Sequence, residues 1–105
     1  MATTPNELLE EVKNYLDITW NDEPTNKKLG GIIERGKKYL DHIAGAELDY
    51  SVNEKPKELL FDYCRYVRSN ALNEFQDNYL SELLSLQFMQ QIKENMEVNN
   101  EEPDI

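Results

Sequence analysis

The stretch LLFDYCRYVRSNALNEF, from Leu59 to Phe75, decides the fold of this chain. Wound as a helix with about 3.6 residues per turn, it places apolar side chains on one broad arc and leaves a narrow polar strip. An ordinary surface helix has an apolar stripe roughly 100° wide, so this wider arc needs several other elements to cover it. We therefore expect a central helix over about residues 56–76. Its arc comprises Leu59, Leu60, Phe61, Tyr63, Cys64, Tyr66, Val67, Ala71, Leu72 and Phe75.

A first helix is expected near the start of the sequence. Thr4 and Glu7 have the spacing of a capping box, with Pro5 at the first helical position. An apolar face then continues to Leu16, where we expect the helix to end. Trp20 follows shortly afterwards, and because tryptophan is highly buried on average, we expect it to anchor the core.

A second helix is expected from the turn at residues 21–24 to about Ala44, because Gly45 is a natural helix stop. Gly36 lies inside the apolar face of this helix. Glycine there costs up to about 1 kcal/mol relative to alanine, so its presence predicts a close approach by another helix. The loop that follows contains two apolar residues, Leu48 and Tyr50, which we expect to hold it against the body.

The fourth helix is expected over residues 79–96, and its apolar pattern rotates partway along. The first half directs one set to one side: Tyr79, Leu80, Leu83, Leu84 and Leu86. The second half directs another set to nearly the opposite side: Phe88, Met89, Ile92 and Met96. The chain is thus predicted to be all-α, with a small four-helix domain over residues 1–96. Residues 97–105 are polar and acidic, and they predict a flexible, disordered tail.

The second apolar set is the candidate protein-interaction surface. Phe88, Met89, Ile92 and Met96 would be exposed if the domain stood alone, and exposed apolar patches mark interaction sites. Methionine also adapts to differently shaped partners. Two structural alternatives remain open: the helix bends, or the tail folds back over the patch.

Charge limits the possible partners. The chain of 105 residues has a formal net charge of −10, which argues against a broad basic footprint for nucleic acid. A candidate basic face nevertheless lies on the second helix, at Lys27, Lys28, Lys37 and Lys38. It is interpreted as a solvated face, or as a surface that pairs with an acidic face of a neighbouring copy.

The sequence lacks the usual constellations of catalysis. The single cysteine, Cys64, lies on the apolar arc and is expected to be a small buried hydrophobe. The single histidine, His42, has no second histidine or cysteine at metal-ligand spacing. We expect no enzymatic activity, no catalytic residue, no metal and no cofactor. No apolar run approaches the roughly 18 residues of a membrane span, and no signal peptide is expected.

Four segments, taken in order, resemble the small phage head-tail connector proteins, the adaptor subunits beneath the portal of tailed bacteriophages, in their Gram-positive phage and prophage form. The resemblance covers most of residues 8–90 and contains no catalytic motif. It rests on order, spacing and short total length. The segments are LEEVKNYL with ITW (residues 9–16 and 18–20), KLGGIIERG with YL (28–36 and 39–40), LLFDYCRYVRSNAL (59–72) and NYLSELL (78–84).

The resemblance implies a structural virion protein that forms a ring and extends the portal channel toward the tail. Its partners would be further copies of itself, the portal protein and a downstream tail or stopper protein. DNA would pass through the ring without sequence-specific binding, and an acidic lumen would suit that passage. The protein would act at the head-tail junction of the virion and, during assembly, in the bacterial host cytoplasm.

Two rival functions remain open. A small acidic regulatory binding protein, such as a DNA mimic or an anti-repressor, would explain the negative charge and the lack of an active site. A small enzyme is the third hypothesis, which tight binding of a small ligand or a metal would support.

Overall fold

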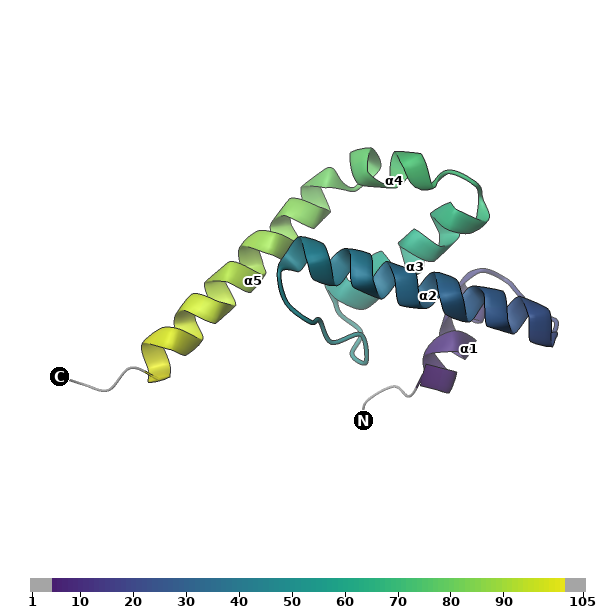
Figure 1. Ribbon diagram of the computed structural model, residues 1–105, viewed down its shortest axis with the longest axis horizontal. Helices are drawn as coiled ribbons and strands as arrows, with labels where there is room; N and C mark the ends of the chain where they lie inside the picture. Colours follow the sequence, from purple (N-terminus) through teal and green to yellow (C-terminus); the bar gives the residue numbers. More distant parts are fainter. Residues whose placement is uncertain (1–4, 102–105) are drawn as a thin grey trace.

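The computed structural model describes the backbone of residues 5–101 and the side chains of residues 7–96. These residues form five helices and no strand, so the all-α prediction is confirmed (Figure 1). The predicted cap residue Thr4 and the last part of the predicted tail, residues 102–105, lie outside the described residues. The helices are α1 (Pro5–Tyr15), α2 (Glu23–Ala44), α3 (Lys55–Arg68), α4 (Leu72–Asn78) and α5 (Leu80–Glu101).

The predicted central helix is wrong in its extent, because it is divided into α3 and α4. Asn70 has a left-handed φ of 56°. The Ala71 N–H donates to the Tyr66 carbonyl at 2.8 Å and the Asn70 N–H donates to the Val67 carbonyl at 3.1 Å. These two bonds form a Schellman motif, which ends a helix. Asparagine tolerates this conformation better than most residues, so Asn70 turns the chain and the domain has five helices.

Helix α1 ends with the same kind of left-handed turn. Asp17 has a φ of 60°, and the Ile18 N–H donates to the Lys13 carbonyl at 2.9 Å. The turn directs Ile18 into the core but leaves Trp20 half exposed, at 50% of its maximal area. The prediction that Trp20 anchors the core is therefore wrong. Its indole N–H instead faces the Thr25 hydroxyl at 3.4 Å, on the surface beside the start of α2.

The bounds of α2 agree with the sequence prediction. The Asp22 carboxylate accepts from the Thr25 backbone N–H at 3.0 Å and from the Thr25 hydroxyl at 2.7 Å, which caps the first turn. These two hydrogen bonds lower the pKa of Asp22. Gly45 ends the helix with a left-handed φ of 76°. Gly36 confirms the predicted close approach, because a Cβ there would lie 2.7 Å from Leu60 Cδ1.

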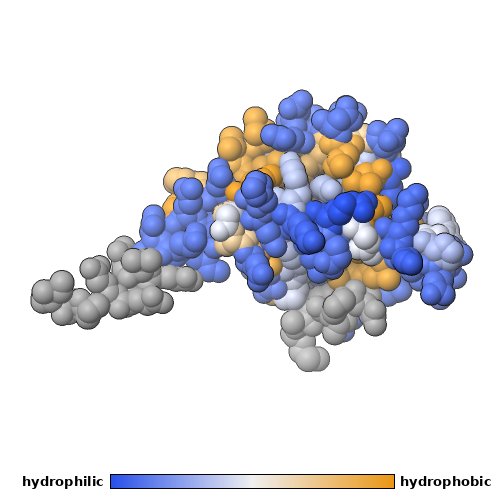
Figure 2. Space-filling view, viewed as in Figure 1, coloured by the Kyte–Doolittle hydropathy of each residue, from blue (hydrophilic) through white to orange (hydrophobic). Residues whose placement is uncertain are grey.

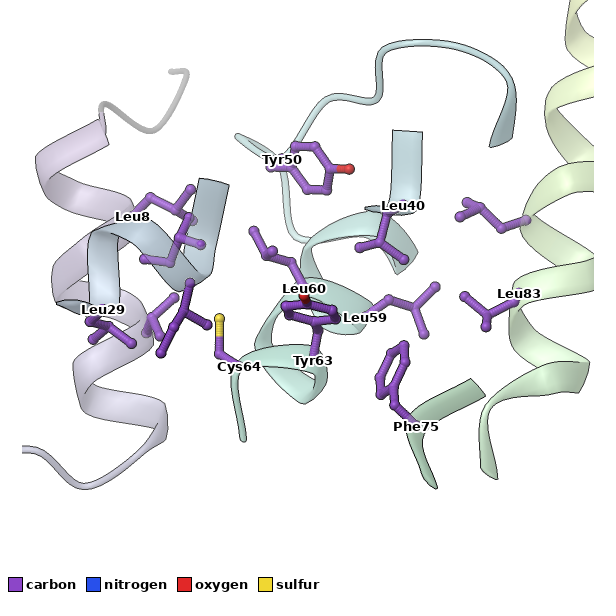
Figure 3. Close-up of a cluster of buried hydrophobic side chains, with 14 of the residues drawn as sticks. Leu8, Leu29, Leu40, Tyr50, Leu59, Leu60, Tyr63, Cys64, Phe75 and Leu83 are labelled. Atoms are coloured by element: carbon purple, nitrogen blue, oxygen red, sulfur yellow. The ribbon is translucent and has the colours of Figure 1, made fainter. Parts of the chain in front are cut away.

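The core lies between α2 and α3, which share the central position predicted for a single helix. Helix α2 packs on α1, α3 and α5, whereas α3 packs on α1, α2 and α4. Figure 3 shows Leu8 and Leu29 at one end of the core and Leu83 of α5 at the other, with Phe75 reaching in from α4. Leu40, Leu59, Leu60 and Tyr63 lie between these two ends (Figure 3).

A polar contact that the sequence did not predict joins α1 to α3. Lys57 is almost fully buried, yet its ammonium donates to Glu11 Oε2 at 2.8 Å and to Asn53 Oδ1 at 3.3 Å. A buried charge is tolerated when it is paired and hydrogen-bonded. The pair therefore fixes where the start of α3 lies against α1.

Among the described side chains of α5, the buried ones lie in its first half. Leu83 and Leu86 are buried against the core, while the predicted core-side residues Leu80 and Leu84 are 47% and 55% exposed. That part of the prediction is wrong, because Leu80 and Leu84 lie about 90° and 130° away from the direction of the buried residues on a regular helix. The second half projects beyond the body (Figure 1), and the backbone stays helical past the predicted end at Met96, to Glu101.

Candidate interaction site

Five exposed apolar residues of α5 form a ridge in steps of four residues. Such an i+4 row is the ridge that packs into the grooves of another helix in the commonest class of helix crossing. Every side chain in the row is at least partly accessible, and hydrophobic atoms gather along the outer edge of α5 in Figure 2. The row consists of Leu80, Leu84, Phe88, Ile92 and Met96.

A groove adjoins the second half of this ridge. It has a volume of about 670 Å³ and lies between α5 and the loop that joins α2 to α3. Met89, Ile92 and Met96 form the α5 wall, and Leu48 and Val52 contribute apolar surface from the loop. Figure 1 shows that loop and the projecting half of α5 on the same side of the molecule.

The predicted interaction surface is therefore exposed but divided. Met89, Ile92 and Met96 line the groove, whereas Phe88 does not and is 61% exposed. On a regular helix Phe88 instead continues the row of Leu80 and Leu84. We refer to Leu80, Leu84 and Phe88 as the outer ridge. The structure has α5 as one helix, and the described side chains leave this set exposed.

The loop wall of the groove is held in place by Asp41 at the end of α2. One carboxylate oxygen, Oδ1, accepts from the Leu48 backbone N–H at 3.1 Å and from the Tyr50 hydroxyl at 2.7 Å. Tyr50 is buried, and burial together with the neighbouring carboxylate raises its pKa. The predicted role of Leu48 and Tyr50 in attaching the loop is confirmed, and the groove has a fixed side.

The rim of the groove is acidic. Glu47, Asp49 and Glu54 line it from the loop, and Lys93 faces them from α5. The Ser51 hydroxyl and backbone N–H both donate to Asp49 Oδ1, and these bonds, with a smaller contribution from Lys93, lower the pKa of Asp49. Three carboxylates against one ammonium give the rim a negative charge at neutral pH.

Only three of the four lysines of the candidate basic face are exposed in the structure. Lys27, Lys28 and Lys38 are exposed on α2, but Lys37 is partly buried, 3.7 Å from Glu34 and above the Tyr50 ring. The exposed face of α2 instead includes Arg35. This helix crosses the front of the molecule in Figure 1, and Figure 2 shows a mostly hydrophilic surface there.

A second polar cluster connects the ends of α1, α3 and α4. The Tyr15 hydroxyl donates to Asp62, and burial with this bond raises the pKa of Tyr15 to about 12. Arg65 lies 3.5 Å from Asp62 and donates to the Tyr79 hydroxyl at 3.1 Å. Arg65 thus links the α3 carboxylate of Asp62 to the end of α4.

The described residues offer no constellation for metal chemistry. No group of three or more histidine, cysteine, aspartate or glutamate side chains among residues 7–96 is placed to hold a metal ion. His42 is exposed on α2, and Cys64 is fully buried in the core. Within the described part of the chain, no helix has the length and apolarity needed to cross a membrane.

Cys64 should resist thiol reagents in the folded protein. Burial raises the pKa of its thiol to about 12, so at pH 8 the reactive thiolate is scarce as well as inaccessible. We expect negligible labelling by a chromogenic disulfide reagent in buffer and complete labelling in denaturing urea. Rapid labelling of the folded chain would contradict the buried position of Cys64.

Comparison of the chain with protein-family models, with characterised proteins and with solved structures finds no significant match in any of the three.

Proposed function

We propose that this chain is the subunit of a phage head-tail connector, which assembles as a ring beneath the portal and extends the DNA channel toward the tail. The observation that carries the proposal is α5, which presents apolar side chains on two faces, the outer ridge on one and the wall of the groove on the other. In a ring each subunit contacts its two neighbours through two different patches, and it also contacts a different protein. The two apolar surfaces of α5 would supply one side of the contact between copies and one contact with a different protein.

The sequence resemblance supports the same function from a different direction. Its four segments fall on α1, α2, α3 and the junction of α4 with α5, which are the parts that build the core. They account for the helical scaffold. The residues that line the groove lie outside all four segments, whereas the outer ridge begins within the last segment and ends beyond it at Phe88. In this proposal the protein acts by assembly, in the host cytoplasm and at the head-tail junction of the virion, and has no catalytic role.

The direct experiment is electron microscopy of the chain mixed with the portal protein of the phage or prophage from which the chain comes. We expect a ring of this chain on the tail-facing side of the portal, even if the isolated chain is a monomer. The exposed α2 face, with Lys27, Lys28 and Lys38, should lie away from the channel, because a basic lumen would retain DNA. A portal that remains bare at high concentrations of the chain would contradict the proposal.

Assembly should depend on α5. Phe88→Asp and Ile92→Asp each place a charge on an exposed apolar surface, so we expect ring formation on the portal to be lost. The free energy of unfolding of Phe88→Asp should change by less than about 1 kcal/mol, because exposed side chains contribute little to folding. Gln87→Asp, which adds the same charge at an exposed position outside both surfaces, is the matched control and should assemble. If both apolar variants assemble normally, α5 is not the interface.

The acidic composition favours a second candidate, a small acidic regulatory binding protein such as a DNA mimic or an anti-repressor. A DNA mimic needs a continuous acidic face, and the exposed basic residues of α2 restrict where such a face can lie. The two proposals separate in a pull-down from infected cells: capture of the portal supports the connector, and capture of a DNA-binding protein supports the regulator.

A further inference from the structure

The groove beside α5 combines three features that define what can occupy it. Its floor and walls are apolar, with Leu86, Met89, Ile92 and Met96 from α5. Its volume of about 670 Å³ is enough for several side chains rather than for a flat contact. Its rim carries Glu47, Asp49 and Glu54 on the loop side, so apolar contact and negative charge lie next to each other.

Both walls of the groove are already ordered in the unbound chain. Asp41 holds the loop wall through Leu48 and Tyr50, so that wall does not need to be ordered on binding. The opposite wall belongs to a continuous helix and includes two methionines, whose unbranched side chains adapt to the shape of a partner. Grooves of this kind bind the apolar face of an amphipathic helix, recognised through residues spaced by three, four and seven positions.

We propose that the groove binds an amphipathic helix of a different protein, whose apolar face enters between α5 and the loop and whose lysine or arginine residues lie against the rim formed by Glu47, Asp49 and Glu54. The choice of a basic helix rests on charge complementarity with these three carboxylates. The inference rests on the proposed function, since it assigns the groove to a heterologous virion partner and leaves the outer ridge for contacts between copies.

A second copy of this chain is a poor occupant. The amphipathic helix α2 has basic residues, but its apolar face is already buried in its own core. The exposed Trp20 has Asp17, Asp22 and Glu23 close to it in the sequence, so docking of Trp20 would bring further carboxylates toward the acidic rim, which electrostatic repulsion disfavours. The outer ridge belongs to a chain with a formal net charge of −10, so its approach to the rim of another copy is disfavoured as well.

The test uses the full chain and two synthetic helical peptides of about 18 residues, long enough to fold as helices. Both carry the same leucine face, and the polar face is lysine in one and glutamate in the other. Binding is followed through the methyl NMR signals of methionine. Met89 and Met96 are both in the groove, and the single tryptophan, Trp20, serves as a fluorescent reporter of the far end of the molecule.

We expect the lysine peptide to shift the Met89 and Met96 signals and to bind at least about tenfold more tightly than the glutamate peptide, with Trp20 emission unchanged. Ile92→Asp should abolish binding even though it makes the chain more acidic, which separates docking in the groove from general charge attraction. Glu47→Gln with Glu54→Gln should weaken binding several-fold. Glu10→Gln with Glu74→Gln removes the same charge from exposed sites on α1 and α4, and it should have no effect.

Three results would overturn the inference. Equal binding of the two peptides, or binding of neither, would remove the basic helix as the occupant. Binding that survives Ile92→Asp would place the peptide elsewhere. Methionine signals that move with protein concentration alone would show that a second copy fills the groove. A connector ring on the portal without peptide discrimination would reject this inference alone, whereas peptide binding without any ring would reject the proposed function alone.

Discussion

Replacing Phe75 with alanine is expected to cost about 3–5 kcal/mol of unfolding free energy, the range typical of a fully buried phenylalanine. Phe75 is only 1% exposed and is the buried residue of α4, a helix of 7 residues. Its ring stacks on Tyr79 with centroids 4.7 Å apart and meets Tyr63 edge-on at 5.7 Å. One side chain therefore holds α4 to the core, and alanine would leave a cavity between α2, α3 and α5.

Urea unfolding followed by circular dichroism measures this effect. A small domain has a total stability of about 5–15 kcal/mol, so the alanine variant lies near the limit of folding, and Phe75→Leu provides a milder form with a smaller loss. Phe88→Ala is the matched control: it removes the same ring from a site that is 61% exposed, and its effect should stay within about 0.5 kcal/mol. Equal losses at Phe75 and Phe88 would contradict the described core.

The break that places Phe75 on its own short helix is the main feature of the fold that periodicity does not predict. From Leu59 to Phe75 the apolar residues fit one continuous helical arc, and the structure keeps them facing the core after the turn at Asn70. The periodicity of apolar residues indicates which side chains are buried. It does not reveal a turn after which the same side of the chain still faces the core. The available signal is local: Ser69 and Asn70 are poor helix formers, and asparagine tolerates a left-handed conformation.

Helix ends with a strong chemical signature are predicted correctly. Helix α2 is an example, with an aspartate and a proline at its start and Gly45 at its end. These residues act on the first and last turns beside them, so the sequence alone indicates their effect. Trp20 shows the opposite case. Its burial depends on where the turn at Asp17 directs the chain, and only Ile18 is close enough to that turn to reach the core.

The exposed apolar residues of the candidate site are predictable from the sequence, but the groove is not. The rotation of apolar residues along α5 indicates that Phe88 and its neighbours face away from the core, and their exposure confirms this. The row of five apolar residues in steps of four, from Leu80 to Met96, is also visible in the sequence, although the predicted pattern placed its first two members on the core side. The groove is not predictable, because its loop wall depends on two hydrogen bonds to Asp41. The pattern of apolar residues does not indicate which side chains form such bonds.

Two glycines of the same helix should respond to alanine in opposite directions. At Gly30 an added Cβ would meet nothing within 4 Å, so Gly30→Ala should stabilise the protein by up to about 1 kcal/mol through helix propensity alone. At Gly36 the added Cβ would lie 2.7 Å from Leu60 Cδ1 and 2.8 Å from Tyr63 Cδ1. Both neighbours are buried in the packed core, so α2 and α3 must separate to admit even one methyl group.

Overpacking of this kind costs about 1–3 kcal/mol, more than the propensity gained, so Gly36→Ala should be destabilising and Gly36→Val more so. The free energy of unfolding of all three variants, measured in urea under the same conditions, tests the sign as well as the size. If Gly36→Ala were as stabilising as Gly30→Ala, the close contact of α2 with α3 would be wrong. Helix α2 also packs on α5. A separation of α2 from α3 would therefore shift α5, the helix that presents both proposed interaction surfaces. Gly36→Val should therefore weaken ring assembly on the portal although it touches neither surface, whereas Gly30→Ala should leave assembly intact.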